Sequence, residues 1–345
     1  MPITRVFVTR RIPQAGLDVL TGGSATVRVG QKDDEAAVPR AVLEDGVRWG
    51  RALLCLLTEP VDRALLGLNP ALMGVAVCAV GYDNVDMAAA TALGIPVSNT
   101  PGILTDTTAD FTWALLLAVA RRVPEAHAYL TAGRYRLWGP NLLLGADVSP
   151  GGSGRRKVLG VVGFGRIGAA VARRAAGFDM DVLAHDPHAR DRIAADPGVR
   201  WAEFDDLLRA SDFVTLHPAL TRDTRHLIDD RALRLMKRSA YLINVARGPV
   251  VDEPALVRAL RSGQIAGAAL DVFEHEPALA PGLAECDNVV LAPHIGSAST
   301  DTRNRMAAMA ATNVLAHLRG ERAPHVINPD VYDSAAYRDR LAANT

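Results

Sequence analysis

The stretch from 157 to 186, KVLGVVGFGRIGAAVARRAAGFDMDVLAHD, limits the fold of this chain more than any other. Its apolar residues at 158–162 lead into a G-x-G-x-x-G turn, a helical stretch runs to about Gly177, and a second apolar run ends at Asp186. A glycine-rich turn alone would be weak evidence, because such turns occur in many folds. Strand, turn, helix, second strand and acid in this order are typical of a dinucleotide-binding βαβ unit.

Each glycine of the motif has a separate physical role. Gly163 allows the tight turn from strand to helix, Gly165 lets a pyrophosphate approach bare backbone, and Gly168 lets the helix pack close to the strand. The N–H groups at the helix start would face the phosphates. Asp186, 18 residues beyond Gly168, can accept hydrogen bonds from both ribose hydroxyls and would repel a 2′-phosphate, so the sequence predicts NAD rather than NADP. The predicted cofactor loop comprises Gly163, Phe164, Gly165, Arg166, Ile167 and Gly168.

Length and composition narrow the class of protein. A chain of 345 residues exceeds one compact core and predicts two domains of ~150–200 residues. Its 38 basic and 38 acidic residues balance and form no basic block, which argues against nucleic acid as a partner. The N-terminus has no apolar signal segment, and the longest lipophilic run, 113–120, is far shorter than the ~20 residues of a membrane span, so we expect a cytoplasmic protein without membrane contact. Cys55, Cys78 and Cys286 are odd in number and widely spaced, which predicts buried thiols without a disulfide framework or a metal site.

Strand and helix patterns alternate along the whole chain, which predicts an α/β fold with two doubly wound parallel-sheet domains. The first set of expected strands lies at 4–9, 25–29, 51–57, 73–80 and 95–98. The second set lies at 158–162, 180–185, 212–216, 240–245, 266–272 and 288–292. The basic, glycine-rich loop at 149–157, just before the second set, is typical of a solvated connector rather than a phosphate site.

Two long helical stretches, 105–122 and 299–318, stand where the chain would leave the first set of strands and return to it. We therefore predict a discontinuous, flavodoxin-like substrate domain formed by 1–104 plus 300–345, and a Rossmann NAD-binding domain formed by 105–299. Ligands of such sheets bind beyond the carboxyl ends of the strands. A cleft between the two domains is thus the expected place of the reacting atoms.

Three ionisable residues follow successive strands of the second set. Arg247 stands just after one apolar strand and before a glycine, Glu276 follows the next strand, and His294 follows the last. Since the carboxyl ends of neighbouring parallel strands lie at one edge of a sheet, these side chains should converge on one crevice. A lone arginine is more often part of a surface ion pair and a lone histidine more often structural, but the three together beside a cofactor loop predict a catalytic group.

Several spaced motifs carry a resemblance to a known family. They are AVGYDNVDMAAATALGIPVSNTPG at 79–102, TADFTWALLLAVARRVPEA at 108–126, LGVVGFGRIG at 159–168, NVARGPVVDEPALVRAL at 244–260, ALDVFEHEP at 269–277 and APHIGSAS at 292–299. In these motifs, and over nearly its whole length, the chain resembles the D-isomer-specific 2-hydroxyacid dehydrogenases. The stretches at 105–122, 138–148 and 301–321 are most similar to the glyoxylate/hydroxypyruvate reductase branch.

The resemblance implies a role for each of the three ionisable residues. Arg247 would hold the substrate carboxylate and polarise the adjacent keto oxygen with its planar fork. His294 would donate a proton to that oxygen during reduction and take it back during oxidation. Glu276, directly before Pro277, would hydrogen-bond the far ring nitrogen and keep the imidazole protonated near neutrality. Two neighbouring ionisable side chains, Glu274 and His275, are expected to be solvated.

Further site residues are implied by the same resemblance. Val80 ends the predicted strand 73–80 and Gly81 follows it. Free backbone N–H groups there can form either an anion nest for the substrate carboxylate or a plain turn, and the family pattern favours the nest. Asp271 matches the acid that holds the nicotinamide carboxamide. The order H-P-A-L at 217–220 departs from the family, which has its proline one place later. The remaining expected cofactor contacts are His217, Pro218, Val245, Ala246 and Gly296.

The implied activity is the NAD(H)-dependent reduction of a small 2-oxo acid, glyoxylate or hydroxypyruvate, to the D-2-hydroxy acid. The alternatives are a D-3-phosphoglycerate dehydrogenase type, which the lack of length for an added regulatory domain disfavours, phosphite or formate oxidation, and an NAD-sensing corepressor scaffold with this fold. A homodimer is also implied. The apolar stripe of Phe111, Trp113 and 115–117 is a candidate interface, although core packing explains it equally well.

Overall fold

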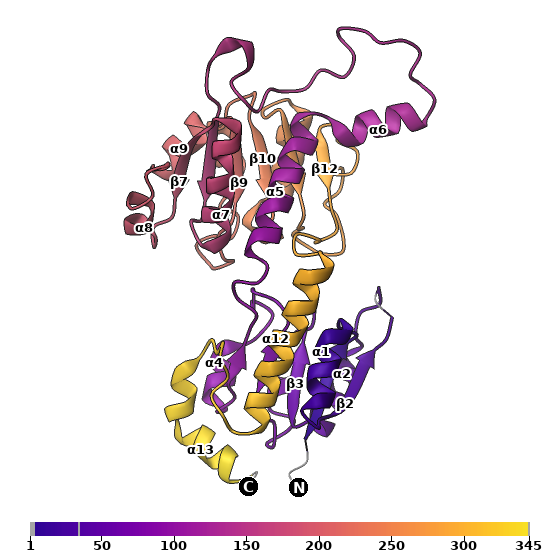
Figure 1. Cartoon of the computed structure of the whole chain (residues 1–345), viewed down its shortest axis with the longest axis vertical. Helices are drawn as coiled ribbons and strands as arrows, with labels where there is room; N and C mark the ends of the chain where they lie inside the picture. Colours follow the sequence, from indigo (N-terminus) through magenta and orange to yellow (C-terminus); the bar gives the residue numbers. More distant parts are fainter. Residues whose placement is uncertain (1–3, 34, 344–345) are drawn as a thin grey trace. The chain divides into compact units, whose positions relative to one another are not determined.

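The computed structural model describes residues 4–33 and 35–343, and the chain divides into two compact units (Figure 1). Unit 1 comprises the residues up to Leu104 together with those from Ala298 onward, and unit 2 comprises Thr105–Ser297. Unit 1 is discontinuous because the chain leaves it before helix α5 (Thr105–Ala120) and re-enters it just before helix α12 (Thr300–Leu318). Both long helices lie where the sequence predicts them.

Unit 1 is built on a parallel sheet with the strand order β2-β1-β3-β4-β5. Successive strand residues point to opposite faces. Accordingly, Phe7 packs with residues of one covering helix, whereas Val6 and Val8 pack on the other face against α12. Both faces are therefore buried, as a fully parallel sheet requires. The strands are β1 (Arg5–Arg10), β2 (Thr26–Gln31), β3 (Ala52–Cys55), β4 (Val75–Val77) and β5 (Val97–Ser98), and the other helices are α1 (Gln14–Gly22), α2 (Arg40–Trp49), α3 (Arg63–Leu66), α4 (Met87–Ala92) and α13 (Ala335–Ala342).

Unit 2 contains a seven-stranded parallel sheet in the order β12-β11-β10-β9-β6-β7-β8. The order reverses at β6, which pairs with β7 on one side and β9 on the other, so a ligand crevice is expected beyond the carboxyl ends of these strands. The strands are β6 (Val158–Val162), β7 (Asp181–His185), β8 (Val199–Trp201), β9 (Phe213–Leu216), β10 (Tyr241–Asn244), β11 (Gly267–Leu270) and β12 (Val289–Leu291). The other helices are α6 (Val123–Thr131), α7 (Arg166–Arg174), α8 (Arg190–Ala194), α9 (Phe204–Ala210), α10 (Asp230–Leu235) and α11 (Glu253–Arg261).

The predicted fold class, an α/β fold with two parallel-sheet domains, is confirmed. Every predicted strand is present: β6 has the predicted bounds, β1 is shifted by one residue, β2 ends two residues later, and the others are shorter than predicted. The edge strand β8 was not predicted, because its three residues are too few to show an apolar pattern. Within the described residues no helix has the length and apolar character needed to span a membrane, and no cluster of potential metal ligands occurs. The three thiols are free, with Cys55 and Cys286 buried and Cys78 half-buried.

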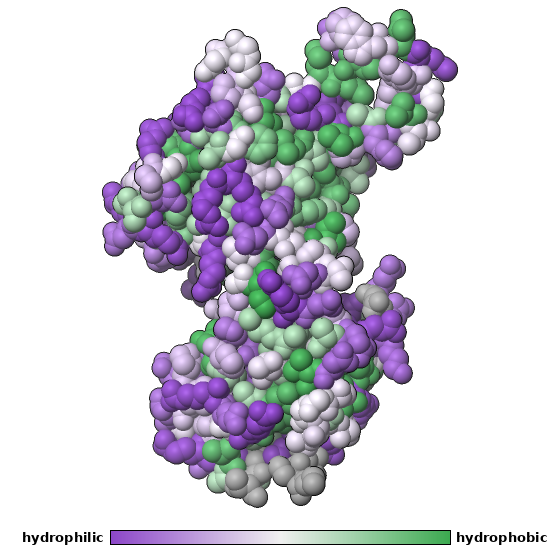
Figure 2. Space-filling model, in the orientation of Figure 1, coloured by the Kyte–Doolittle hydropathy of each residue, from purple (hydrophilic) through white to green (hydrophobic). Residues whose placement is uncertain are grey.

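The apolar stripe of α5 belongs to the core of unit 2. Trp113 stacks on Phe178 with ring centroids 4.5 Å apart and donates a hydrogen bond from Nε1 to the Val171 carbonyl at 3.1 Å, and Leu116 is fully buried. Core packing therefore accounts for Trp113, Leu115 and Leu116, whereas Phe111 and Leu117 are only partly buried. Exposed apolar side chains lie instead on α6 and the segment after it, where Figure 2 shows apolar atoms on the surface at upper right. They are Val123, Leu130, Leu137, Trp138, Leu142 and Leu144.

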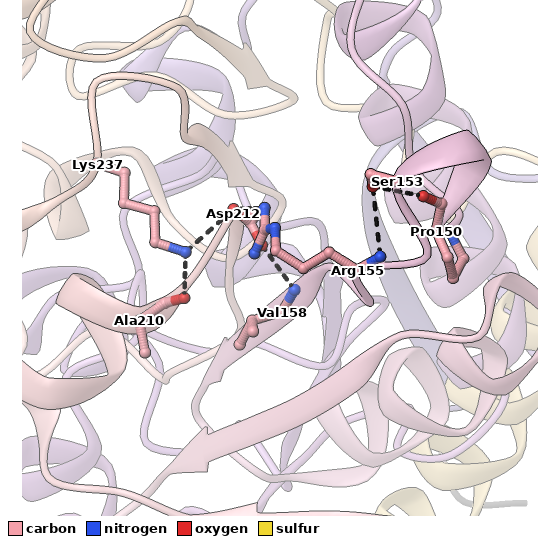
Figure 3. Close-up of polar contacts among 7 residues, drawn as sticks. All are labelled: Pro150, Ser153, Arg155, Val158, Ala210, Asp212 and Lys237. Carbon is pink, nitrogen blue, oxygen red and sulfur yellow. Dashed lines mark hydrogen bonds and ion pairs between the residues drawn. The ribbon is translucent and has the colours of Figure 1, made fainter.

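The connector at 149–157 is exposed over most of its length, and both of its arginines bind to the rest of unit 2. Arg156 Nε donates to the Asp179 carbonyl at 2.8 Å, and the contacts of Arg155 are drawn in Figure 3. Arg155 donates two hydrogen bonds, of 3.2 and 3.0 Å, to the Asp212 carboxylate at the amino end of β9. Lys237 Nζ (3.0 Å) and the Val158 amide (2.9 Å) donate to the same carboxylate, whose side chain is only 7% exposed. Burial raises the pKa of Asp212, but Arg155, the amide and Lys237 together outweigh it and leave the pKa below its usual value.

Candidate active site

The glycine loop after β6 has the shape that a bound pyrophosphate needs. Gly163 has a φ of +87°, and a Cβ there would lie 2.6 Å from the backbone at 217–218. A Cβ on Gly168 would lie 2.1 Å from the Gly163 carbonyl oxygen, so helix α7 packs directly on the turn. No atom lies within 4 Å of a Cβ built on Gly165. That open space, at the start of α7, fits the diphosphate of a dinucleotide.

Asp186 follows β7 and touches the glycine loop. Its Oδ2 accepts a hydrogen bond from the Phe164 amide at 2.9 Å, and its Oδ1 accepts one from the His188 amide at 2.9 Å. The Arg192 guanidinium donates to the Phe164 carbonyl on the same loop. The carboxylate thus lies at the end of the second strand of the βαβ unit, where a ribose is bound in dinucleotide folds.

His217 lies beside the glycine loop at the carboxyl end of β9. Its amide donates to the Val162 carbonyl at 2.7 Å, but both nitrogens of its imidazole are buried and lack a hydrogen-bond partner among the described residues. Burial lowers the pKa of His217 to about 3, so the ring is neutral. A buried polar group without a partner is costly, and a bound cofactor would be able to supply one.

The loop that carries Arg247 is braced by a side chain at the end of β10. Asn244 Oδ1 accepts from the Ala246 amide at 3.0 Å, and Asn244 Nδ2 donates to the Arg247 carbonyl at 3.0 Å. Arg247 itself is partly exposed and donates from Nη1 to the Ala246 carbonyl at 2.8 Å. A Cβ on Gly248 would lie only 1.9 Å from the Phe273 carbonyl group, so this loop packs against the loop that follows β11.

Asp271, at the end of β11, organises the turn that contains His294. Its carboxylate oxygens accept from the Ile295 and Gly296 amides, both at 2.7 Å, and its carbonyl accepts from the His294 amide at 2.8 Å. Burial raises the pKa of Asp271. His294 has a φ of +54°, a conformation uncommon for residues other than glycine. The buried carboxylate of Asp271 thus holds the backbone that orients the imidazole.

The imidazole of His294 is paired with Glu276. Its Nδ1 lies 3.0 Å from Glu276 Oε2, and Glu276 Oε1 accepts from the Phe273 amide at 3.0 Å. The His294 and Glu276 side chains remain 27% and 31% exposed, and Nε2 has no partner among the described residues. Burial raises the pKa of Glu276, but the hydrogen bond and charge of His294, the Phe273 amide and the charge of Arg247 outweigh it and lower the pKa. The predicted Arg247, Glu276 and His294 therefore share the carboxyl edge of one sheet.

Comparison with known proteins agrees with this geometry. The sequence model of the D-isomer specific 2-hydroxyacid dehydrogenase NAD-binding domain matches residues 113–296. The glyoxylate reductase of Korarchaeum cryptofilum is 49% identical over 330 residues, which cover 95% of this chain and 96% of that protein. The chain belongs to the D-isomer-specific 2-hydroxyacid dehydrogenase family. This dehydrogenase is accordingly an oxidoreductase that uses NAD(P) and a small 2-oxo or 2-hydroxy acid.

Solved structures support the same assignment. A protein of Thermus thermophilus matches with a TM-score of 0.85 and 42% identity, over 94% of the dehydrogenase and 99% of that chain. A glyoxylate reductase of Paecilomyes thermophila matches with a TM-score of 0.80 and 30% identity, over 96% and 100%. An NADPH-dependent glyoxylate/hydroxypyruvate reductase of Sinorhizobium meliloti, in complex with NADP and malonate, matches with a TM-score of 0.77 and 31% identity, over 97% and 98%. The predicted resemblance to this family and to its glyoxylate reductases is confirmed.

One prediction about the dehydrogenase is wrong. The Glu274 side chain is not solvated but only 7% exposed, and its Oε1 lies 2.6 Å from His226 Nε2 and 3.2 Å from Arg225 Nη2. Two potential cations therefore compensate its charge, which permits the burial. His275, in contrast, is exposed as expected. No sequence pattern indicated His226, because it lies in an irregular segment that lacks the strand-end position of the other site residues.

In unit 1 two asparagine side chains hold the segment after β4. The Val80 carbonyl accepts from Asn99 Nδ2 at 2.8 Å, and the Asn99 carbonyl accepts from Asn313 Nδ2 of α12 at 3.0 Å. Because the C=O and N–H of one trans peptide point in opposite directions, this contact turns the Gly81 N–H away from Asn99. No acceptor among the described residues meets that N–H. Asn99 was not predicted, since an asparagine after a strand is more often a turn residue, and no pattern in the sequence of α12 indicated Asn313.

Proposed function

We propose that this dehydrogenase uses NADH to reduce a small 2-oxo acid, glyoxylate or hydroxypyruvate, to the D-2-hydroxy acid. The observation that carries the proposal is the His294–Glu276 pair, in which Nδ1 is engaged at 3.0 Å and Nε2 is left without a partner among the described residues. An imidazole anchored through one nitrogen can exchange a proton with substrate through the other. The glyoxylate reductase activity named for the relatives supports the choice of substrate.

Each residue of the group has a defined task in the proposed reaction. Arg247 binds the substrate carboxylate and withdraws charge from the keto oxygen through charge-assisted hydrogen bonds. His294 donates its Nε2 proton to that oxygen as negative charge develops there, and Glu276 stabilises the protonated ring from the Nδ1 side. Bound NADH supplies the hydride for the keto carbon. Reduction then leaves a neutral imidazole, which takes a proton from solvent before the next cycle.

The proposed substrate-binding residues, Val80, Gly81, Arg247 and His294, come from both units, whereas the cofactor-binding residues come from unit 2 alone. We expect unit 1 to bind the substrate carboxylate with the backbone N–H groups of Val80 and Gly81, and unit 2 to hold the dinucleotide. The remaining expected cofactor contacts are the glycine loop, Asp186, His217, Pro218, Val245, Ala246, Asp271 and Gly296. The Asp271 carboxylate already accepts two backbone hydrogen bonds, so any contact with the nicotinamide amide would use its remaining lone pairs.

NAD is favoured over NADP because the Asp186 carboxylate lies against the glycine loop and would repel a 2′-phosphate. A homodimer with cytoplasmic location is also part of the proposal. The dimer is supported by the exposed apolar side chains of α6 and the segment after it, where Leu137 is 82% and Trp138 73% exposed. Such exposure of large apolar side chains is costly without a partner surface. Size-exclusion chromatography with light scattering tests the dimer.

Steady-state NADH oxidation with a panel of 2-oxo acids tests the activity. We expect the highest kcat/KM with glyoxylate or hydroxypyruvate, and a lower value with phosphohydroxypyruvate, pyruvate and longer acids. The His294→Asn variant should lose turnover with every member of the panel. A preference for phosphohydroxypyruvate would make the protein a phosphoglycerate dehydrogenase type, and NADH binding without turnover of any acid would favour the corepressor alternative.

A further inference from the structure

A second histidine–glutamate pair lies next to the proposed catalytic pair in unit 2. His226 Nε2 and Arg225 Nη2 both approach Glu274 Oε1, at 2.6 and 3.2 Å. Glu274 is two residues before Glu276 on the same loop, and its side chain is buried while those of His226 and Arg225 remain partly exposed. This pair takes no part in the proposed proton transfer. Because Glu274 lies two residues before Glu276, however, its contacts with His226 and Arg225 hold the loop that carries Glu276.

The backbone at Glu274 is held by a buried carboxylate as well. Its amide donates to Glu253 Oε1 at 2.7 Å, and Glu253 stands buried at the start of α11. Burial raises the pKa of Glu253. Residue 274 is therefore fixed in two directions, through its side chain to 225–226 and through its amide to α11. Position 276 cannot move far while both contacts persist.

The segment that contains His226 also contacts the loop of Arg247. The His226 amide donates to the Pro249 carbonyl at 2.8 Å, and the Ile228 amide donates to the Val250 carbonyl at 3.0 Å. His226 has a φ of +51°, which is uncommon for a residue with a side chain. Its backbone is thus bound to the residues just after Arg247, while its imidazole is bound to the residue just before the Glu276 turn. His226 joins the two loops of the proposed site.

We propose that His226 and Glu274 are positioning residues of this dehydrogenase, which hold the Glu276 carboxylate within hydrogen-bond distance of His294. The proposal rests on the catalytic roles assigned above to Glu276 and His294. Hydrogen bonds weaken steeply beyond about 3.2 Å, so a shift of a few tenths of an ångström would weaken the 3.0 Å contact between Nδ1 and Oε2. Without it the protonated imidazole loses the carboxylate that stabilises it. Proton donation would then fail at lower pH.

The test is the pH dependence of kcat/KM for 2-oxo acid reduction in a His226→Ala variant. The charged groups that face His294 are Glu276 and Asp271, with Arg247 beside Glu276, and all three stay in place in this variant. We expect the alkaline limb of the profile to move toward acid, by less than in Glu276→Gln. We also expect kcat near neutral pH to fall by roughly 10- to 100-fold, the cost of misplacing a catalytic group, with the NADH KM unchanged.

Matched variants separate positioning from general damage. His226→Gln keeps a donor toward Glu274 and should recover most of the activity. His226→Leu fills the volume of the imidazole without a donor, so it should shift the alkaline limb as His226→Ala does. It also provides the test if His226→Ala does not fold. His275→Ala removes an exposed imidazole from the same loop and should leave the limb where it is. In the Glu276→Gln background, His226→Ala should move the limb no further, because both changes remove the same interaction.

The outcomes distinguish the two levels of the proposal. If Glu276→Gln moves the alkaline limb and neither His226→Ala nor His226→Leu does, the positioning role is refuted and the catalytic pair stands. If Glu276→Gln itself leaves the limb in place, the assignment of the catalytic pair is wrong and the positioning role goes with it. If the His226→Leu enzyme loses thermal stability but keeps the pH profile of kcat/KM, the His226–Glu274 pair is a structural contact only.

Discussion

The two edges of the sheet in unit 2 each hold a carboxylate whose pKa is lowered, but the two carboxylates are used differently. At the amino edge, Asp212 receives hydrogen bonds from a guanidinium, an ammonium and an amide, and its side chain is only 7% exposed (Figure 3). At the carboxyl edge, Glu276 receives one amide and one imidazole and remains 31% exposed. The first carboxylate ties strands together. The second pairs with His294 Nδ1, while the other ring nitrogen meets no partner among the described residues.

This difference shows how one fold separates stability from chemistry. A carboxylate whose lone pairs are all taken by fixed donors has no capacity left for a ligand. Glu276, in contrast, has only one amide and one imidazole nitrogen as partners, and its side chain stays partly exposed. Variants at the two edges should therefore change different measurements.

The largest expected effect is at the carboxyl edge. In His294→Asn the proton donor is lost, and kcat for 2-oxo acid reduction should fall by roughly 10²–10⁴-fold. His294 lies outside the glycine loop, so the dissociation constant for NADH, measured by fluorescence quenching, should change little. The Tm should also change little. A His294→Asn enzyme with near-normal turnover would remove this residue from the mechanism.

Arg247 should show the next largest effect. Arg247→Lys keeps the positive charge but loses the planar fork, so kcat/KM should fall by about two decades, on the order of 3 kcal/mol, for every 2-oxo acid alike. A loss confined to one substrate would mean that Arg247 contacts a substituent and not the shared carboxylate. Arg258→Lys, on α11 and paired with Asp230 outside the proposed site, is the control.

Asp212 should change stability and leave the chemistry intact. Asp212→Asn removes the charged acceptor of Arg155 and Lys237, and we expect a loss of about 2 kcal/mol in the free energy of unfolding, with kcat unchanged. Because the folded pKa is below the unfolded value of about 3.9, the stabilisation is present above that pH and is lost as the pH falls through the folded pKa.

Urea unfolding between neutral pH and pH 3 measures the Asp212 contribution directly. The stability gap between wild type and Asp212→Asn should begin to narrow at the acid end of this range. An Asp212→Asn protein of wild-type stability at neutral pH would show that the exposed part of Arg155 leaves the cluster too well solvated to matter.

The smallest expected effect is at Asp186. Asp186→Ala should raise the NADH KM by about tenfold and narrow the preference for NADH over NADPH, since both the ribose contacts and the repulsion of a 2′-phosphate are lost. Asp186→Asn keeps an acceptor for the Phe164 amide and separates the loss of charge from a disturbed loop. A wild-type enzyme that already prefers NADPH would contradict the assignment.

The carboxyl edge was largely predictable from sequence, because Arg247, Glu276 and His294 each follow an apolar strand and parallel topology brings strand ends together. The amino edge was not. Asp212 meets Arg155 and Lys237, which are 57 and 25 residues away in the sequence, and no local pattern links them. The same holds for the contact between His226 and Glu274, 48 residues apart.

Two further features needed the packed structure. The sequence of the apolar stripe on α5 is compatible with a core or an interface, and only the structure shows that Trp113 stacks on Phe178 in the core of unit 2. The bracing amides of Asn244 and Asn99 are also invisible in sequence, because asparagine at a strand end is equally common in a simple turn. Patterns of apolar residues locate strands, but they do not identify which polar side chains turn inward.

The contact of Gly248 with the Phe273 carbonyl has a consequence for how the enzyme can diversify. Even the methyl group of an alanine at 248 would lie 1.9 Å from that carbonyl and would force the two loops apart. A library randomised at this position and selected for turnover should therefore return glycine alone. A library randomised at Gly165, where the added carbon meets no protein atom, should retain folded but poorly binding members. Substitution of Gly248 is therefore incompatible with the packing of the protein itself, whereas substitution of Gly165 is incompatible only with binding of the cofactor.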